Sequence, residues 1–178
     1  MIFKKKIFLC GFMGCGKTAV GKKLSGRLNC GFKDTDTLIE NLEKKSVSQI
    51  FESKGESYFR SLETAVLSDI ASNPDKIEVI STGGGIVLSH VNFDIMNKCG
   101  LTVYLSAESE TIADRVNPNT RPLLKNLTPC QLKNKINDML DFRKEKYENC
   151  GIIIKTDNLT IDEVVETLIL KIESKIAL

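Results

Sequence analysis

The stretch that decides the fold of this chain is Gly11-Phe12-Met13-Gly14-Cys15-Gly16-Lys17-Thr18. It matches the pattern G-x-x-x-x-G-K-[ST] in full. A short apolar run at residues 7–9 precedes it, and the helical pattern of residues 19–28 follows it. In this context the pattern cradles phosphate, because glycines let backbone N–H groups turn inward and a helix N-terminus adds positive charge. The stretch therefore predicts a site for a nucleoside triphosphate rather than an ordinary glycine turn.

Individual side chains of this loop have distinct expected roles. Lys17 is long enough to reach the terminal phosphates, and the Thr18 hydroxyl can ligate Mg²⁺. Cys15 is either a reactive thiol near a helix N-terminus or ordinary variation at a free loop position. We favour the second interpretation, because nothing in the pattern requires sulfur there.

Composition narrows the class of protein. The 178 residues are 42% hydrophobic and 27% charged, which predicts one globular domain over residues 1–178. The net charge of +2 gives no basic footprint for nucleic acid. No apolar stretch approaches the ~20 residues of a membrane span, so we expect a soluble, cytoplasmic protein. We also expect a monomer. The six cysteines include no C-x-x-C pair and the chain has one histidine, so neither a metal cluster nor a disulfide framework is expected.

Short strand patterns alternate with helical patterns along the chain. The expected strands lie at residues 7–9, 32–36, 77–80, 101–105 and 152–154. The expected helices lie at residues 19–28, 37–44, 47–51, 56–72, 89–96, 108–116 and 128–149, and from 160 onward. Apolar strands separated by helices predict an α/β fold of three αβα layers, in which a five-stranded parallel sheet is covered on both faces.

Ligands of such sheets bind outside the carboxyl ends of the strands, where three features of this sequence should meet. These features are the acidic pair Asp34 and Asp36, the glycine turn at residues 83–85, and a basic, proline-containing loop at residues 115–124. One carboxylate could sit near Mg²⁺ while the other orients an incoming hydroxyl. The alternative is that an aspartate here simply caps the next helix.

Short motifs beyond the phosphate loop share one order with a known family. They are Asp34-Thr35-Asp36, Phe59-Arg60-Ser61-Leu62-Glu63, Gly83-Gly84-Gly85, Arg121-Pro122-Leu123-Leu124, and Arg143 with Tyr147. Together with Gly11–Thr18 they resemble the shikimate kinase family nearly end to end. The resemblance implies a P-loop kinase fold with a lid at about residues 115–127 and a substrate-binding helical region at about residues 36–64. It also implies ATP-dependent phosphorylation of the 3-hydroxyl of shikimate, giving shikimate 3-phosphate and ADP, in aromatic amino acid (chorismate) biosynthesis.

The resemblance also implies roles for single residues. ATP would be bound by Gly14, Cys15, Gly16, Lys17, Thr18, Ala19, Arg115 and Arg121. Shikimate would be bound by Asp36, Arg60, Gly83, Gly84, Gly85 and Arg143. Mg²⁺ would be held by Thr18 and Asp34, and the catalytic residues would be Lys17, Asp36 and Arg121.

Elementary chemistry favours the same acceptor. Arg60 and Glu63 are three residues apart on a predicted helix, so the carboxylate can hold the guanidinium in place. Two converging arginines suit a planar carboxylate. One alternative is a kinase of similar architecture for another small metabolite, such as gluconate, which has less need of the pair Arg60 and Arg143. Another is a non-catalytic nucleotide-binding module, which could dispense with Asp36 and Arg121.

Overall fold

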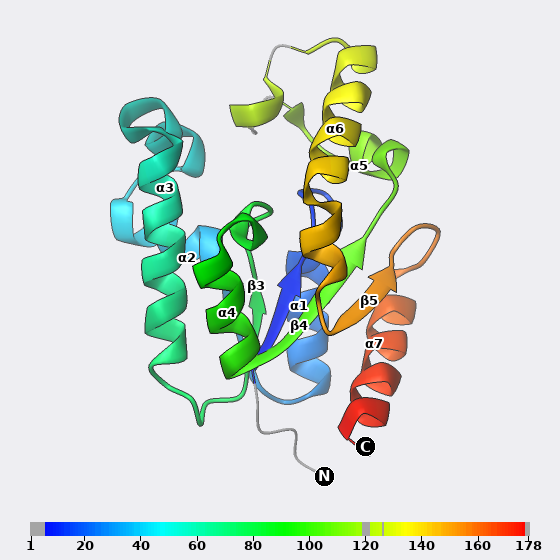
Figure 1. Ribbon diagram of the computed structural model, residues 1–178. Helices are drawn as coiled ribbons and strands as arrows, with labels where there is room; N and C mark the ends of the chain where they lie inside the picture. The colour runs from blue at the N-terminus through cyan, green and yellow to red at the C-terminus, as the bar shows by residue number, and fades with distance from the viewer. Residues whose placement is uncertain (1–5, 119–121, 126, 177–178) are drawn as a thin grey trace.

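The architecture is seen in a computed structural model, which describes residues 6–118, 122–125 and 127–176 (Figure 1). Five strands form one sheet: β1 (Lys6–Cys10), β2 (Gly31–Asp34), β3 (Glu78–Ser81), β4 (Gly100–Ser106) and β5 (Ile152–Lys155). Their order across the sheet is β2-β3-β1-β4-β5, and each neighbouring pair is parallel. The predicted α/β class with a five-stranded parallel sheet is confirmed.

Helices cover both faces of this sheet (Figure 1). They are α1 (Lys17–Arg27), α2 (Thr35–Glu43), α3 (Val47–Ala71), α4 (His90–Cys99), α5 (Ser109–Arg115), α6 (Pro129–Glu148) and α7 (Ile161–Ile176). The central strand shows the layering directly, because its side chains alternate between two apolar cores. Ile7 and Leu9 belong to the core beneath α1 and α7, whereas Phe8 and Cys10 belong to the core beneath α3 and α4.

Local chemistry sets two helix boundaries near the predicted site. Asp34 ends β2, and its side chain accepts hydrogen bonds from the backbone N–H groups of Asp36 and Thr37. Helix α2 therefore begins at Thr35, and Asp36 lies in its first turn rather than at the strand end. The expectation that both aspartates end the strand is wrong, because the Asp34 cap starts the helix two residues earlier than expected.

Helix α3 is interrupted within its bounds. Gly55 has φ 80° and ψ 172°, a conformation that breaks the helix between the two segments expected from the sequence. Two short 3-10 turns, η1 (Ile86–Leu88) and η3 (Pro122–Leu124), were not expected. The first follows the glycine turn directly, and the second lies in the proline-containing loop.

Lysines of α7 contact one edge of the sheet, and the sequence motifs lie at the carboxyl ends of its strands. At the outer edge, Lys171 and Lys175 of α7 donate to the backbone carbonyls of Ile153 and Gly151 on and beside β5. The opposite ends of the strands, where the carboxyl termini of β1 and β3 lie, carry the motifs described below. Across the described ranges, no helix has the length and apolar character to cross a membrane.

Candidate active site

The phosphate loop runs from the end of β1 to the start of α1. Gly11, Gly14 and Gly16 have φ values of 143°, 82° and 92°, which favour glycine. A Cβ atom on Gly14 would lie 2.7 Å from the Cγ2 atom of Val116, so close packing requires glycine there as well. Gly16 precedes α1 without a side-chain cap, so the first N–H groups of the helix remain directed at the loop. This is an anion-binding geometry.

Lys17 lies within this loop and is 92% buried, with an exposed fraction of 8%. Its Nζ atom donates to the carbonyl oxygens of Gly11 and Phe12, each at 2.8 Å. It also lies 3.8 Å from the Sγ atom of Cys15, whose side chain is buried in the core below. Only the backbone of Cys15 can therefore meet a ligand, which favours the interpretation of ordinary variation at that position.

Three oxygen-bearing side chains meet beside the loop. The Thr18 hydroxyl donates to Asp34 Oδ2 at 2.8 Å and lies 3.4 Å from the hydroxyl of Ser81. Hydroxyl and carboxylate oxygens suit Mg²⁺, which takes one or two protein ligands and completes its shell with water and phosphate. The donor set therefore fits a magnesium ion.

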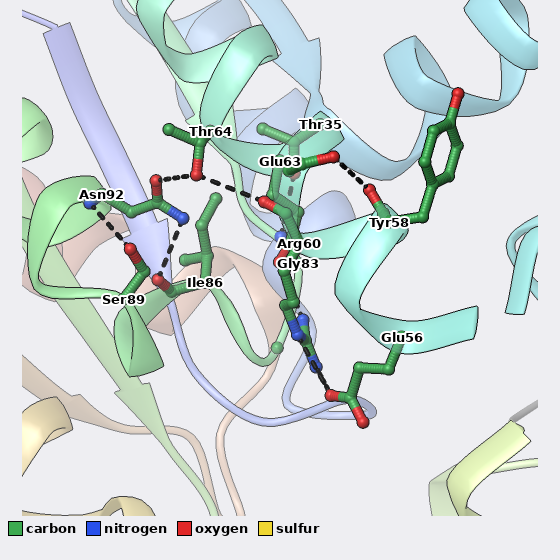
Figure 2. A network of polar contacts seen from close by, with 12 residues as sticks. Thr35, Glu56, Tyr58, Arg60, Glu63, Thr64, Gly83, Ile86, Ser89 and Asn92 are labelled. Atoms are coloured by element: carbon green, nitrogen blue, oxygen red, sulfur yellow. Dashed lines mark hydrogen bonds and ion pairs between the residues drawn. The ribbon is translucent and has the colours of Figure 1, made fainter. Parts of the chain in front are cut away.

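Arg60 on α3 is held between two glutamates (Figure 2). Its Nη1 atom pairs with Glu63 Oε2 at 2.8 Å, and its Nη2 atom pairs with Glu56 Oε1 at 2.6 Å. The Glu63 side chain is wholly buried, and its Oε1 atom accepts no hydrogen bond from the described residues. Burial raises the pKa of Glu63 to about 7, although the charge of Arg60 opposes this shift. The guanidinium is thus fixed, as the three-residue spacing predicted.

The glycine turn packs closely against these side chains. A Cβ atom on Gly83 would collide with carboxylate oxygens of both Glu63 and Asp36. A Cβ atom on Gly85 would lie 2.5 Å from Arg60 Nη1. The Gly83 N–H donates to the Thr35 hydroxyl at 2.9 Å, which joins the turn to the start of α2 (Figure 2).

The second arginine comes from α6, on the other side of the turn. Arg143 is 4% exposed, its Nη1 atom donates to the Gly84 carbonyl at 3.0 Å, and its guanidinium lies 5.3 Å from the ring centre of Phe12. Its Nε atom is buried and donates to no acceptor among the described residues. A buried guanidinium with an unused donor is prepared for an anionic ligand.

One cavity of about 340 Å³ brings these groups together. It is lined by Gly14, Gly16, Lys17, Thr18, Ala19, Asp34, Asp36, Arg60, Gly83, Gly84, Gly85, Arg115 and Arg143, all of which the sequence predicted as site residues. Arg115 also donates to the Thr156 carbonyl at 3.4 Å. Of the other two predicted residues, Cys15 lies buried beneath the loop and Arg121 lies outside the described residues.

Sequence reasoning missed part of the lining. Ser81 and Thr82 line the cavity at the end of β3, and Val47, Phe51 and Phe59 of α3 form an apolar wall. A signal for this wall exists, because Val47 and Phe51 are four residues apart on one helix face. Ser81 lies two residues before the glycine turn, at the carboxyl end of a predicted strand, and this position could have indicated that it lies near Thr18.

Comparisons with known proteins agree on one family. The family model described as shikimate kinase matches residues 13–173. The shikimate kinase of Azobacteroides pseudotrichonymphae is 39% identical over 170 residues, covering 94% of this chain and 99% of that protein. The shikimate kinase of Sulfurihydrogenibium sp. is 41% identical over 172 residues, covering 96% of this chain and 99% of that protein.

Solved structures extend the likeness to the fold. The structure of shikimate kinase from Acinetobacter baumannii in complex with shikimate matches with a TM-score of 0.90 and 31% identity, covering 98% of this chain and 96% of that chain. Shikimate kinase from Bacteroides thetaiotaomicron matches with a TM-score of 0.85 and 32% identity, covering 98% of this chain and 99% of that chain. These matches confirm the predicted P-loop kinase fold. This chain belongs to the shikimate kinase family.

Proposed function

We propose that this protein transfers the γ-phosphoryl group of ATP to the 3-hydroxyl of shikimate, giving shikimate 3-phosphate and ADP in the chorismate route to aromatic amino acids. The observation that carries the proposal is a single cavity lined both by a phosphate loop and by two arginines that flank a glycine turn. A triphosphate and a small carboxylic acid can therefore be held within reach of each other.

The donor half would bind ATP through the backbone of residues 14–19. Lys17 would exchange the carbonyls of Gly11 and Phe12 for the phosphate oxygens, which are better acceptors because they are charged. Thr18 and Asp34 would hold Mg²⁺, Asp34 through water. When bound, Mg²⁺ would supply positive charge to the phosphates.

The acceptor half would hold shikimate by its carboxylate and ring hydroxyls. Arg60, held by Glu63, and Arg143 would grip the carboxylate, assisted by N–H groups of the glycine turn. Asp36 would bind the ring hydroxyls, align the attacking oxygen and accept its proton. Because phosphoryl transfer depends mainly on position and charge, this fixed arrangement accounts for much of the expected rate.

The remaining assignments complete the proposal. Residues 1–178 would act as one domain, in which the helical region at about 36–64 binds shikimate and the lid at about 115–127 closes on ATP. Arg121 would approach the γ-phosphate, and Arg115 would pack on the adenine. Lid closure would exclude water and so limit wasteful hydrolysis of ATP. We expect a cytoplasmic monomer that binds no nucleic acid.

The test is to incubate the protein with MgATP and shikimate, measuring ADP by a coupled assay and the phosphate ester by ³¹P NMR. Gluconate serves as the control acceptor, and Lys17→Met as the control for a contaminating kinase. We expect the phosphate ester and ADP to form in equal amounts with shikimate and not with gluconate. Preference for gluconate would favour the other metabolite kinase, and ATP binding without turnover of either acid would favour a non-catalytic module.

A further inference from the structure

Three side chains of α6 contact the glycine turn and the 3-10 turn that follows it, and two of them, Lys146 and Tyr147, have no role in the proposed function. Arg143 Nη1 and the Tyr147 hydroxyl both donate to the carbonyl oxygen of Gly84, at 3.0 Å and 2.5 Å. Lys146 Nζ donates to the carbonyl of Leu88 at 3.2 Å. Tyr147 follows Arg143 by four residues, so the two side chains project from one face of the helix. A single backbone oxygen therefore receives two donors from adjacent turns of α6.

The surroundings of Tyr147 keep its hydroxyl in one place and in one protonation state. The residue is wholly buried, and its ring stacks on Tyr104 of β4 with centroids 4.6 Å apart and planes 4° apart. Burial raises the pKa of Tyr147 well above its usual value, so the hydroxyl remains a proton donor. A hydroxyl in an apolar core needs a hydrogen-bond partner, and the Gly84 carbonyl is that partner.

Gly84 occupies the junction between the two halves of the site. A Cβ atom there would lie 3.3 Å from the backbone nitrogen of Met13 and 3.5 Å from the carbonyl oxygen of Gly11. The residue thus packs on the phosphate loop with one side, while its carbonyl accepts hydrogen bonds from α6. A shift of this peptide would change the spacing between donor and acceptor.

The orientation of the next N–H group follows from the same two hydrogen bonds. A trans peptide unit is planar, so fixing the Gly84 carbonyl toward α6 turns the N–H of Gly85 in the opposite direction. Gly85 lies against Arg60, whose Nη1 atom a Cβ there would approach to 2.5 Å. The hydroxyl of Tyr147 thereby influences the two groups expected to receive the substrate carboxylate, the Gly85 N–H and Arg143.

We propose that Tyr147 is a positioning residue for the acceptor acid, acting through the Gly84–Gly85 peptide and through Arg143. This inference rests on the proposed function, since it assigns Tyr147 to the acceptor half. Without the hydroxyl, Arg143 alone would hold the carbonyl and would give up part of its freedom to meet the carboxylate. The KM for shikimate should then rise while the handling of ATP stays the same.

The kinetic test compares two conservative variants. Tyr147→Phe removes the hydroxyl and keeps the stacked ring. Tyr104→Phe is the matched control, because the described contacts include no hydrogen bond from the Tyr104 hydroxyl. We expect Tyr147→Phe to raise the KM for shikimate about tenfold, with the KM for ATP and kcat within about twofold. The control should leave all three constants unchanged. Equal effects of the two variants, or equal losses toward ATP and shikimate, would overturn the proposal.

A second measurement does not depend on activity. In ¹⁵N-labelled protein without substrate, Tyr147→Phe should shift the Gly85 amide resonance, because the lost hydrogen bond was to the carbonyl of the same peptide unit. Tyr104→Phe should leave that resonance in place, and an unmoved resonance in Tyr147→Phe would overturn the inference. If Tyr147→Phe does not fold, Tyr147→4-aminophenylalanine, which keeps a donor, is compared with Tyr147→4-fluorophenylalanine, which has none. If the wild type is inactive on shikimate while Tyr147→Phe still shifts the Gly85 amide resonance, the proposed function alone is contradicted.

Discussion

The proposed donor and acceptor halves of the site are built in different ways. The donor half is one contiguous loop, Gly11–Thr18, whose geometry comes from glycines with positive φ and from backbone N–H groups at the start of α1. The acceptor half combines side chains from α2, α3 and α6 around the turn after β3. Arg60 and Arg143 reach it from helices that are far apart in sequence, and each depends on a specific contact.

This difference determines what each half tolerates. In the donor loop a side chain can vary when it faces the core, as Cys15 does, because the backbone supplies the ligand-binding groups. In the acceptor half even one methyl group would displace a charged side chain at Gly83 or Gly85. Substitutions should therefore separate the halves cleanly, with effects on one substrate only.

The largest effect is expected from Lys17→Met, which removes the buried ammonium group of the donor half. We expect kcat to fall about 100- to 1,000-fold, because the charge that develops on the transferred phosphoryl group loses a stabilising partner. Lys23→Met on the same helix is the control, since Lys23 pairs with Asp162 at the surface. Steady-state kinetics gives kcat, and calorimetry gives the Kd for shikimate, which should not change. Loss of shikimate affinity in Lys17→Met would show that the halves are not separable.

Gly83→Ala tests the acceptor half by bulk alone. The new Cβ atom would push against Glu63 and Asp36, so kcat/KM for shikimate should fall about 10- to 100-fold at an unchanged Kd for ATP. Gly26→Ala is the matched control, because a Cβ on Gly26 meets no atom within 4 Å. Both constants come from initial rates and from nucleotide titration. If ATP binding weakens as much as shikimate turnover, the comparison between halves fails.

Arg60→Lys should act on one substrate and mainly on binding. A lysine keeps the charge but loses the planar fork, so we expect the KM for shikimate to rise about tenfold with kcat little changed. Arg27→Lys, in which a surface ion pair with Glu166 is altered, should leave the kinetics unchanged. The KM is measured at saturating ATP, and a normal value in Arg60→Lys would remove this residue from the carboxylate site.

The last effect is on the stability of the acceptor half rather than on catalysis. The pKa of Glu63 is raised from 4.5 to about 7 by burial, against the charge of Arg60, while Asp36 adds to the rise and Arg143 opposes it. The folded protein therefore binds a proton that the unfolded chain releases, so this contribution to stability is complete below pH ~4.5 and is lost as the pH rises through about 7.

Glu63→Gln should remove this part of the pH dependence. Between pH 5 and 8 we expect the free energy of unfolding of the wild type to fall by about 2 kcal/mol more than that of the variant. Urea titrations at several pH values measure it, with Glu56→Gln as the control because Glu56 is half-exposed and also pairs with Arg60. Parallel curves for wild type and Glu63→Gln would contradict the expectation.

The placement of the phosphate loop between a strand and a helix could be predicted from the sequence because its information is local. A contiguous pattern between a strand and a helix identifies a phosphate loop without knowledge of the remaining fold. The parallel sheet was also predictable, since short apolar strands alternate with helices. The position of Asp36 was predicted wrongly. The start of α2 is set by the Asp34 cap, and hydrophobic periodicity carries no information about that cap.

The acceptor half depended on resemblance, because its contacts are long-range. Spacing on α3 predicted the pair Arg60 and Glu63. No spacing could reveal that Tyr147 and Arg143 share the carbonyl of Gly84, or that Ser81 lies beside Thr18. These contacts arise from the order of strands in the sheet, which brings segments of distant sequence to one edge.

Two lysines of α7 donate to the carbonyls of Ile153 and Gly151, and these contacts should limit association of this protein with other chains through the sheet edge. A strand at the border of a sheet is a template on which a foreign strand can grow, and aggregation often starts there. Here ammonium groups already bind two backbone carbonyls at this edge, and an approaching strand would have to displace them and bury their charge. Helix α7 thus both protects the edge of the sheet and packs against α1 over the core.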